Sequence, residues 1–334
     1  MISPKQSNAI NTTRIFMVLG VIMVHCNILS SLPTDHSTII IDHIVKFFSE
    51  EFPRFCVPWF FFISAYIAGN KYPRLPRNLY FNLLKKRFQS ILIPYILWNT
   101  LALLFWQIIN LSLLSKYTSG GYHFTSIGQF FIDLYISPIL VPLWFLRNLM
   151  VFILALPLLK RLLRLSPTLF IITSILLEYF TPLSGIFYYS LGLVFANHDD
   201  KLNLIFKNSY AMGAVYCIIA LFSTLSGHNI FDIPVLGLIA VLLGLFAFWG
   251  ICQNINAQQF KNTSGMVFFM YAFHGIISPY AIKGLALTCH FHGFGYIIYY
   301  IITFATVTIT SYLAYAILKR IFPTGIRVLT GQRT

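Results

Sequence analysis

The stretch Ile10-Asn-Thr-Thr-Arg14-Ile-Phe-Met-Val-Leu-Gly-Val-Ile-Met-Val-His25-Cys-Asn-Ile-Leu29 is apolar enough to enter a bilayer, yet it carries two ionisable side chains. Arg14 and His25 are eleven residues apart, which at 100° per residue is about three helical turns. They therefore share one stripe of the predicted helix and lie about 16 Å apart along its axis. We expect this stretch to be the first membrane span.

The pair of ionisable residues has two interpretations. An arginine in a spanning helix is costly, and it normally faces a bundle interior or a water-filled cavity. In the simpler interpretation, Arg14 extends its head group toward a helix end and His25 only packs. In the other, the stripe is a polar track that reaches into the membrane and has a base at its far end.

The composition restricts the class of protein. Of the 334 residues, 57% are hydrophobic and only 10% are charged, whereas a soluble domain carries about 25% charged residues. The chain is therefore an integral membrane protein with no room for a large soluble domain. Its net charge of +14 would suit nucleic acid, but the basic residues form short clusters between apolar segments. That distribution is typical of the positive-inside rule, so we expect a lipid bilayer and no nucleic acid as partner.

The five cysteines indicate neither a disulfide framework nor a metal site. They are scattered, odd in number and mostly within apolar runs, and no Cys-x-x-Cys or Cys/His ligand spacing occurs. We expect no metal. The first apolar segment also lacks an Ala-x-Ala-like cleavage site, so we interpret it as retained.

Apolar windows of about twenty residues recur along the chain and predict an all-α, polytopic bundle of about ten transmembrane helices. The predicted spans are 10–30, 55–71, 91–113, 141–159, 167–181, 183–196, 209–226, 232–252, 264–283 and 294–318. The fifth and sixth meet at Thr181-Pro182-Leu183, so a tight turn or a broken helix is expected there. We expect a single transmembrane domain over residues 1–334.

The lysines and arginines predict the orientation. With the N-terminus in the cytoplasm, seventeen of the 23 basic residues fall in cytoplasmic segments. The opposite segments hold Lys46, Arg54, Lys116 and Lys283. Both termini are thus predicted to be cytoplasmic, with a short basic tail from about residue 319.

Three loops stand out. The first external loop, about 31–54, is predicted to contain a short amphipathic helix around Ile39–Phe48. The external loop at about 114–140 holds Gly120, Gly121 and Tyr122 and is typical of a flexible cover. The cytoplasmic loop at 71–90 is the most basic stretch. Its charge is explained either by topology alone or by an anion site for a phosphorylated donor.

Two later segments carry further polar residues. Pro142-Leu-Trp144-Phe-Leu-Arg147 opens the fourth span, which places Arg147 one to two turns below the outer face, and Glu178 is a candidate counter-charge. The ninth span carries His274 within Tyr271-Ala-Phe-His274, near mid-membrane. On an isolated helix, a buried histidine is more often a packing residue than a chemical one.

These stretches together resemble one family, the membrane-bound acyltransferase-3 proteins, which O-acylate cell-surface glycans. Arg14 and His25 resemble the Arg-x10-His signature of that family's first span. Val57-Pro-Trp-Phe-Phe-Phe-Ile-Ser64-Ala-Tyr is similar to its second span, "VPLFFFISGY". Lys86-Arg87 followed by Ile93-Pro-Tyr resembles the segment that leads into its third span.

The resemblance extends to the later segments, because Pro142–Arg147 is similar to the family's "LWFL" segment and Tyr271–His274 to its "YLxH" segment. Three positions depart from the family pattern. Asn11 stands where an aspartate is frequent, Ile15 where a glycine is common, and Ser90 replaces the second arginine of an Arg-x-x-Arg motif. These departures bear on donor binding more than on the family.

The resemblance implies a membrane-bound O-acetyltransferase in the bacterial cytoplasmic (inner) membrane. Its co-substrate would be acetyl-CoA from the cytoplasm, and its acceptor a cell-surface or lipid-linked polysaccharide such as O-antigen or exopolysaccharide. A neutral histidine with a pKa near 6.5 suits the removal of a hydroxyl proton, so His25 is the expected base and Arg14 its supporting cation. The expected donor-binding residues are Arg74, Arg77, Lys86 and Arg87. The expected substrate or oxyanion support comes from Ser64, Trp144, Arg147 and His274.

Two rival classes have their own expectations. A multi-pass transporter or flippase for a glycan or small anion would also place charges at mid-membrane, and the fifth and sixth spans could be its broken helices. It gives no reason for a basic cytoplasmic loop combined with a histidine at the outer end of the arginine stripe. A scaffold protein would tolerate loss of Arg14, His25 and Arg147 apart from effects on stability. The sequence leaves open the sugar, the acyl group, a covalent intermediate and the oligomeric state.

Overall fold

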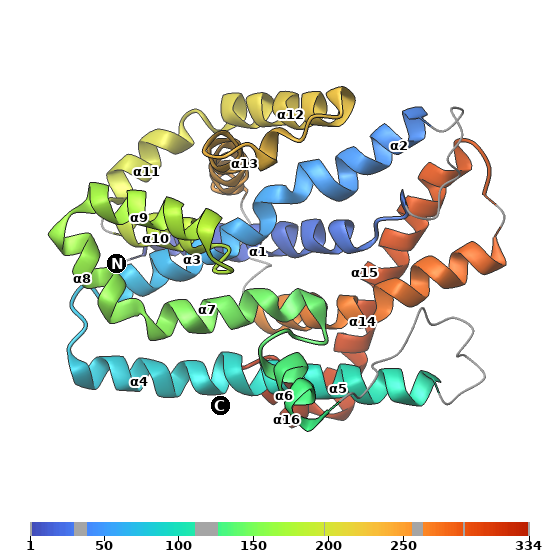
Figure 1. The fold of residues 1–334 in the computed structure, drawn as a ribbon, viewed down its shortest axis with the longest axis horizontal. Helices are drawn as coiled ribbons and strands as arrows, with labels where there is room; N and C mark the ends of the chain where they lie inside the picture. The colour runs from blue at the N-terminus through green and yellow to red at the C-terminus, as the bar shows by residue number, and fades with distance from the viewer. Residues whose placement is uncertain are drawn as a thin grey trace. The chain divides into compact units, whose positions relative to one another are not determined.

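The computed structural model describes residues 2–29, 39–110, 126–196, 198–255, 263–289 and 291–332, with only the backbone of Asn110 and Asp199. Throughout this part of the chain the regular secondary structure is helical (Figure 1). The α-helices are α1 Pro4–His25, α2 Ile39–Lys46, α3 Cys56–Lys71, α4 Arg77–Arg87, α5 Ile93–Asn110, α6 Ile127–Tyr135, α7 Trp144–Leu154, α8 Leu156–Leu165, α9 Pro167–Phe180, α10 Ile186–Phe195, α11 Asp199–Phe206, α12 Ser209–Ser226, α13 Leu236–Cys252, α14 Ser264–Thr288, α15 Gly295–Ile321 and α16 Pro323–Leu329. Short π- and 3₁₀-helical segments join α2 to α3 and α4 to α5.

Within the described residues, six helical stretches are long and apolar enough to cross a membrane, which makes the chain a polytopic membrane protein. They are Pro4–His25, Ile39–Lys71, Arg77–Ile109, Ser209–Ser226, Ser264–Thr288 and Gly295–Ile321. A seventh candidate is a pair of helices, Val141–Leu154 and Leu156–Leu165, bent by 61°. These seven correspond to the predicted spans one to four, seven, nine and ten. The other three predicted spans are the shorter apolar helices α9, α10 and α13.

The bend between α7 and α8 has a local cause. Pro157 occupies the first turn of α8, where its ring tolerates a helix start but cannot continue the helix of the preceding residues. Beyond the bend, α8 becomes amphipathic and carries Lys160, Arg161 and Arg164. The apolar run predicted as the fourth span therefore ends at a proline-defined corner.

The turn between α9 and α10 is built around a carboxylate and a glycine. Glu178 accepts hydrogen bonds from the backbone N–H groups of Gly185, at 2.8 Å, and Phe187, at 3.0 Å. Gly185 has φ +95°, and a Cβ there would lie 2.2 Å from the Phe61 ring. The tight turn predicted between the fifth and sixth spans is therefore present. Glu178 therefore caps this turn. Its predicted role as counter-charge to Arg147 stays a prediction.

The chain forms two compact units, and each is described by itself. Unit 1 comprises Met1–Val21, Glu50–Leu84 and Val151–Ser264. Within it, α10 packs against both α3 and α9, and α12 crosses α13, which Figure 1 shows nearly end-on. Trp249 of α13 packs edge-on against Phe62 and Tyr66 of α3, with ring centroids 5.8 and 5.5 Å away. The core of unit 1 is thus aromatic.

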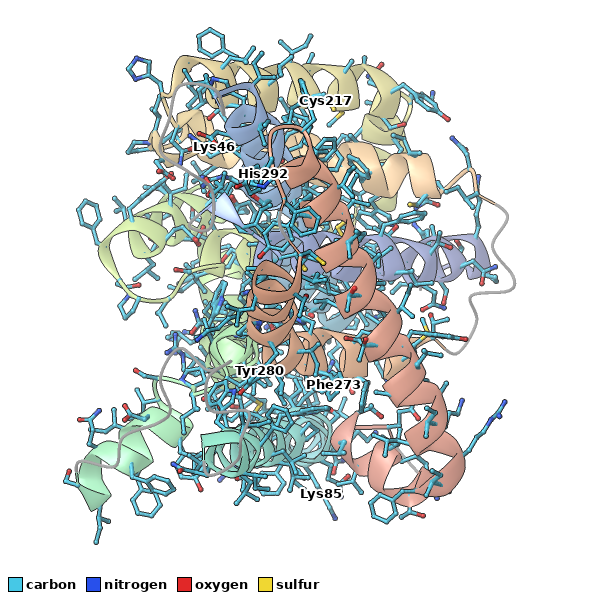
Figure 2. All side chains as sticks on the ribbon, turned by 90° about the vertical axis from the view of Figure 1, so that its right-hand side faces the viewer. Lys46, Lys85, Cys217, Phe273, Tyr280 and His292 are labelled. Atoms are coloured by element: carbon cyan, nitrogen blue, oxygen red, sulfur yellow. The ribbon has the colours of Figure 1, made fainter. Side chains whose placement is uncertain are left out.

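Unit 2 comprises Ile22–Ser49, Lys85–Met150 and Gly265–Thr334. Phe273 and Tyr280, both labelled in Figure 2, lie on the side of α14 that packs against α5, since a spacing of seven residues is about two turns. Their rings pack against Trp98 and Phe105 of α5, with centroids 6.3 and 5.5 Å apart. Trp98 also donates its indole N–H to the carbonyl of Leu329, at 2.9 Å. The predicted basic tail therefore contains a helix, α16, that docks on α5.

Two predicted loops contain helices in unit 2. The amphipathic helix predicted around Ile39–Phe48 is present as α2. The described part of the loop predicted as a cover, residues 126–140, contains α6 and is attached to α5. Tyr95 donates to the carbonyl of Tyr135 at 3.0 Å, and Asn99 accepts from the N–H of Leu140 at 3.1 Å. Gly120, Gly121 and Tyr122 lie outside the described residues.

Candidate active site

Two histidines meet in unit 2. His25 is the last residue of α1 and is half-buried, whereas His274 lies in α14 and is fully buried, with 0% of its surface exposed. Their ring centroids are 4.9 Å apart, and the ring planes are inclined by 53°. The two predicted site residues, far apart in sequence, therefore form one pair of imidazoles.

The hydrogen bonding of His274 defines which of its nitrogens can accept a proton. Its Nδ1 lies 3.1 Å from the carbonyl oxygen of Met270. A carbonyl only accepts, so Nδ1 carries the hydrogen, and in the neutral ring the lone pair lies on Nε2. That Nε2 is buried and has no hydrogen-bond partner among the described residues. A buried polar atom without a partner requires a physical explanation, and a catalytic role is one of the recognised ones.

The wall beside His274 is built from the motif that opens α7. Tyr271 donates its hydroxyl to the carbonyl of Pro142, and its ring packs edge-on against Phe145 at 5.9 Å. A Cβ added to Gly275 would lie 2.9 Å from side-chain carbons of Leu140 and Pro142. The Pro142–Arg147 segment and the Tyr271–His274 segment therefore contact each other closely.

Arg147 and Trp144, two of the predicted support residues, lie on this α7 segment in unit 2. Arg147 donates to the carbonyl of Ile136 and, at 3.0 Å, to the side-chain oxygen of Asn148. Both acceptors are neutral, so these contacts orient the guanidinium without cancelling its charge. Trp144 is half-exposed at the start of α7.

Arg14 and Ser64 belong to unit 1. Arg14 is half-buried and donates to the side-chain oxygen of Asn11 at 3.2 Å. Because Asn11 is a neutral amide, this contact orients the guanidinium and adds no opposite charge. Arg14 and His25 are in the same unbroken helix, α1, as the predicted stripe requires. Ser64 is half-buried in α3.

The four predicted donor-binding cations do not form a compact cluster. Arg77 and Arg87 are the first and last residues of the eleven-residue helix α4, which places them about 15 Å apart. Arg74, Arg77 and Lys86 are exposed, and Arg87 is half-buried. Arg77 also lies 5.6 Å from the centroid of the Phe81 ring. Arg77, Lys86 and Arg87 follow one another along α4, and Arg74 precedes it. We name these four residues the basic row, and their role in donor binding stays a prediction.

Sequence reasoning missed the supporting contacts of His274. The carbonyl of Met270 and the Tyr271–Pro142 hydrogen bond determine how His274 is presented. Tyr271 stood in the recognised motif, so its spacing of three residues from His274 was an available signal. No signal in the sequence indicated the pairing of His274 with His25, because this pairing depends on how α1 and α14 pack. No group of three or more potential metal ligands occurs among the described residues.

The chain is a helical, multi-pass membrane protein, and it holds a buried imidazole whose free nitrogen can accept a proton. It therefore belongs to the class of membrane proteins suited to acid–base chemistry. The family model described as an acyltransferase domain, the acyltransferase-3 domain, matches residues 7–316, nearly the whole chain. The chain therefore belongs to the acyltransferase-3 family and is a membrane acyltransferase. No curated protein and no solved structure matches it.

Proposed function

We propose that the protein is an O-acetyltransferase of the bacterial inner membrane. It moves an acetyl group from cytoplasmic acetyl-CoA to a hydroxyl of a cell-surface or lipid-linked polysaccharide, such as O-antigen or exopolysaccharide. The observation that carries the proposal is the pair of His25 and His274, with rings 4.9 Å apart and one buried ring nitrogen free to accept a hydrogen bond. A polar pair of this kind in a membrane is costly without a role.

The chemistry follows from the roles of these groups. His25 removes the proton of the acceptor hydroxyl as the oxygen attacks the thioester carbonyl, and the thiolate of CoA leaves and is then protonated. His274 positions His25 or the acceptor, because its Nε2 can accept one hydrogen bond. Arg14 or Arg147 stabilises the oxyanion, since a guanidinium stays charged in a membrane. Ser64 and Trp144 support the substrate.

We also propose ten spans with both termini in the cytoplasm. Contacts inside unit 1 support this arrangement, because they join segments that the positive-inside rule assigns to one side. Arg54 forms a 3.3 Å ion pair with Asp232. Arg54 lies in a predicted external segment, and Asp232 lies at the predicted outer end of the eighth span. Lys160 donates to the carbonyl of Tyr72, and both lie in predicted cytoplasmic segments. The helices α9, α10 and α13 are then short spans.

A transporter or flippase remains the rival function. It would also use charged residues in the membrane, but it gives no reason for a basic cytoplasmic loop combined with a histidine at the outer end of the arginine stripe. The two functions differ in a measurable way, because a transporter leaves its cargo chemically unchanged.

The test is transfer of label from acetyl-CoA. Membranes that contain the protein are incubated with acetyl-labelled CoA, and label is scored in the lipid-linked and surface glycan fractions. We expect alkali-labile acetyl label in glycan, absent from membranes without the protein. Glycan that reaches the outer face without any label would contradict the enzyme and favour the flippase.

A further inference from the structure

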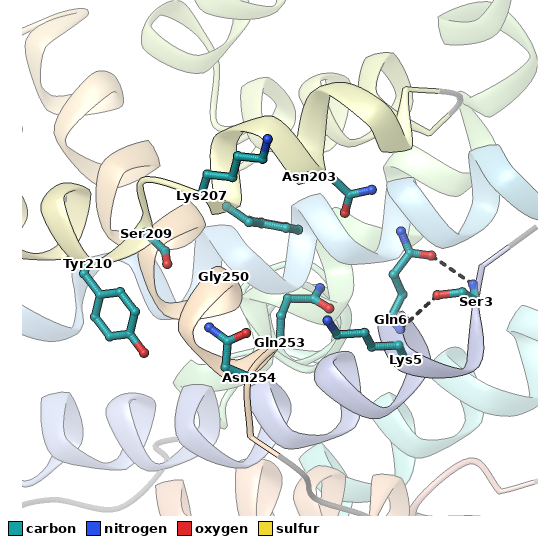
Figure 3. Close-up of a pocket in the computed structure, with 11 residues that line it drawn as sticks. Ser3, Lys5, Gln6, Asn203, Lys207, Ser209, Tyr210, Gly250, Gln253 and Asn254 are labelled. Carbon is teal, nitrogen blue, oxygen red and sulfur yellow. Dashed lines mark hydrogen bonds between the residues drawn. The ribbon is translucent and has the colours of Figure 1, made fainter.

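Unit 1 contains a polar pocket that none of the predicted sites explains. It has a volume of about 680 Å³, within the range of small-molecule sites. The start of α1, the end of α11, the start of α12 and the end of α13 surround it (Figure 3). The eleven lining residues are Ser3, Lys5, Gln6, Asn203, Phe206, Lys207, Ser209, Tyr210, Gly250, Gln253 and Asn254. We name this set of residues the N-terminal pocket.

The charge of the N-terminal pocket has one sign. Lys5 and Lys207 are its charged lining residues, and none of the eleven is acidic. The others supply mostly amide and hydroxyl groups, which can donate hydrogen bonds to an anion. Lys5 also stands in the first turn of α1, a turn without an acidic residue. A cation there is unfavourable because the helix N-terminus is itself positive. A bound anion would remove this conflict.

One hydrogen-bond donor of the N-terminal pocket has no partner among the described residues. The side chains of Ser3 and Gln6 satisfy each other's backbone N–H groups, at 3.2 and 2.9 Å. The amide nitrogen of Gln253, by contrast, is buried and has no hydrogen-bond partner among the described residues. Figure 3 shows Gln253 and Lys5 extending into the same opening between α1 and α13. A ligand that accepts hydrogen bonds and carries negative charge fits both groups.

The N-terminal pocket also has a flat apolar side. The Phe206 ring lines it and is held edge-on by Trp249, with centroids 5.0 Å apart. A Cβ added to Gly250 would lie 3.1 Å from the Phe206 ring and 2.7 Å from the Cβ of Ser209. Gly250 thus keeps the space beside the ring open. An aromatic face beside two lysines suits an organic phosphate with a planar ring.

A second basic pocket in unit 1 is a weaker candidate. It has a volume of about 280 Å³, and its lining includes Lys160, Arg164 and His198. The ammonium of Lys160 already donates to the carbonyl of Tyr72, and Arg164 donates to the carbonyl of Pro73 at 3.4 Å. Those two cations are therefore engaged by the backbone, whereas Gln253 of the N-terminal pocket has an unused donor.

We propose that the N-terminal pocket binds the phosphate groups of the acyl donor, through Lys5, Lys207 and Gln253. This step rests on the proposed function, which supplies a phosphorylated donor on the side where α1 begins. Helix α1 leads from the pocket into the membrane. Lys5 lines the pocket in the first turn of α1, and Arg14 lies nine residues later, about 14 Å further along the axis. A donor anchored at the pocket can therefore extend its thioester arm along α1 toward Arg14.

The test measures binding of coenzyme A, without acyl transfer, to the purified protein in nanodiscs of neutral phosphatidylcholine. Lys5→Gln and Lys207→Gln should each raise the dissociation constant about tenfold or more, since each removes a charge-assisted contact. Lys201→Gln is the matched control, because Lys201 is an exposed lysine of α11 outside the pocket. It should bind coenzyme A like the wild type. Size-exclusion profiles verify that all variants are folded.

The outcomes separate the two proposals. Wild-type binding that neither pocket variant changes would overturn the N-terminal pocket and leave the proposed function standing. A wild type that neither binds coenzyme A nor transfers acetyl would overturn the proposed function as well. A phospholipid head group offers the same phosphate chemistry, so native mass spectrometry is run with phosphatidylglycerol nanodiscs. Loss of retained lipid in the variants, with coenzyme A binding unchanged, would assign the pocket to lipid and overturn the donor proposal.

Discussion

His25 is the residue on which the proposed chemistry depends, because it is the half-buried member of the histidine pair and ends the helix that carries Arg14. We predict that His25→Ala inserts and folds like the wild type, since it removes one polar group from the end of a long apolar helix. Its rate of acetyl transfer should fall by about 10²–10⁴-fold, the usual contribution of a general base. The measurement is acetyl transfer per folded protein, quantified by fluorescence-detected size exclusion.

A well-folded His25→Ala protein that transfers acetyl at nearly the wild-type rate would refute this assignment. The base would then be sought at His274, whose Nε2 is buried and has no partner among the described residues. The carbonyl of Met270 holds the hydrogen of His274 on Nδ1, so this second imidazole is already in the form that accepts a proton at Nε2.

Arg14 provides the second residue-scale prediction. Arg14→Lys keeps a positive charge but loses the planar fork, so we expect at least a tenfold loss in kcat with an unchanged amount of inserted protein. Arg161→Lys is the control, because Arg161 is exposed on α8 and outside the proposed site. Equal activities of the two variants would show that charge alone is needed at position 14.

At the scale of the element, α4 carries three residues of the basic row, which was predicted to bind the donor. Arg77 is exposed at its first turn, and Arg87 is half-buried about 15 Å away at its last. If the row contacts CoA phosphates, Arg77→Ala and Arg87→Ala should each raise the KM for acetyl-CoA about tenfold, because a charge-assisted contact contributes about 1.5–3 kcal/mol. Wild-type KM values in both variants would leave the row with a topological role only.

The packing of α10 on α3 gives a second prediction at this scale. A Cβ added to Gly192 would lie 2.2 Å from the carbonyl oxygen of Phe62, so the two helices approach at backbone contact. We expect Gly192→Ala to destabilise the protein by about 1–3 kcal/mol through overpacking, seen as a lower melting temperature in detergent. Gly213→Ala is the control, because its Cβ would lie an ordinary 3.6 Å from Ala247. Equal melting temperatures would contradict the close approach.

At the scale of the whole molecule, the proposed orientation can be tested with single cysteines in a cysteine-free background. Position 77 lies in the predicted cytoplasmic loop, and position 228 lies between α12 and α13 in a predicted external segment, with both side chains exposed. In intact cells an impermeant thiol reagent should label His228→Cys and spare Arg77→Cys, and permeabilised cells should label both. Strong labelling at 77 with none at 228 in intact cells would reverse the topology.

The sequence by itself determined the membrane class, the helical architecture and the acyltransferase-3 family. Length and hydropathy define a spanning helix locally, because a bilayer requires every backbone polar group to be satisfied within its own segment. The candidate residues Arg14 and His25 could also be placed on one stripe, since helical periodicity is a local property. Seven of the ten predicted spans match long apolar helices or the bent pair.

Only the tertiary structure decided which of these residues meet. The pairing of His25 with His274, the contact of Tyr271 with Pro142 and the docking of α6 on α5 join segments distant in sequence. The N-terminal pocket likewise needs four helix ends at once. The physical reason is that apolar helix faces are nearly interchangeable in lipid, so helix partners are selected by close packing and a few polar contacts. Close packing and polar contacts between helices cannot be read from the periodicity of a single segment.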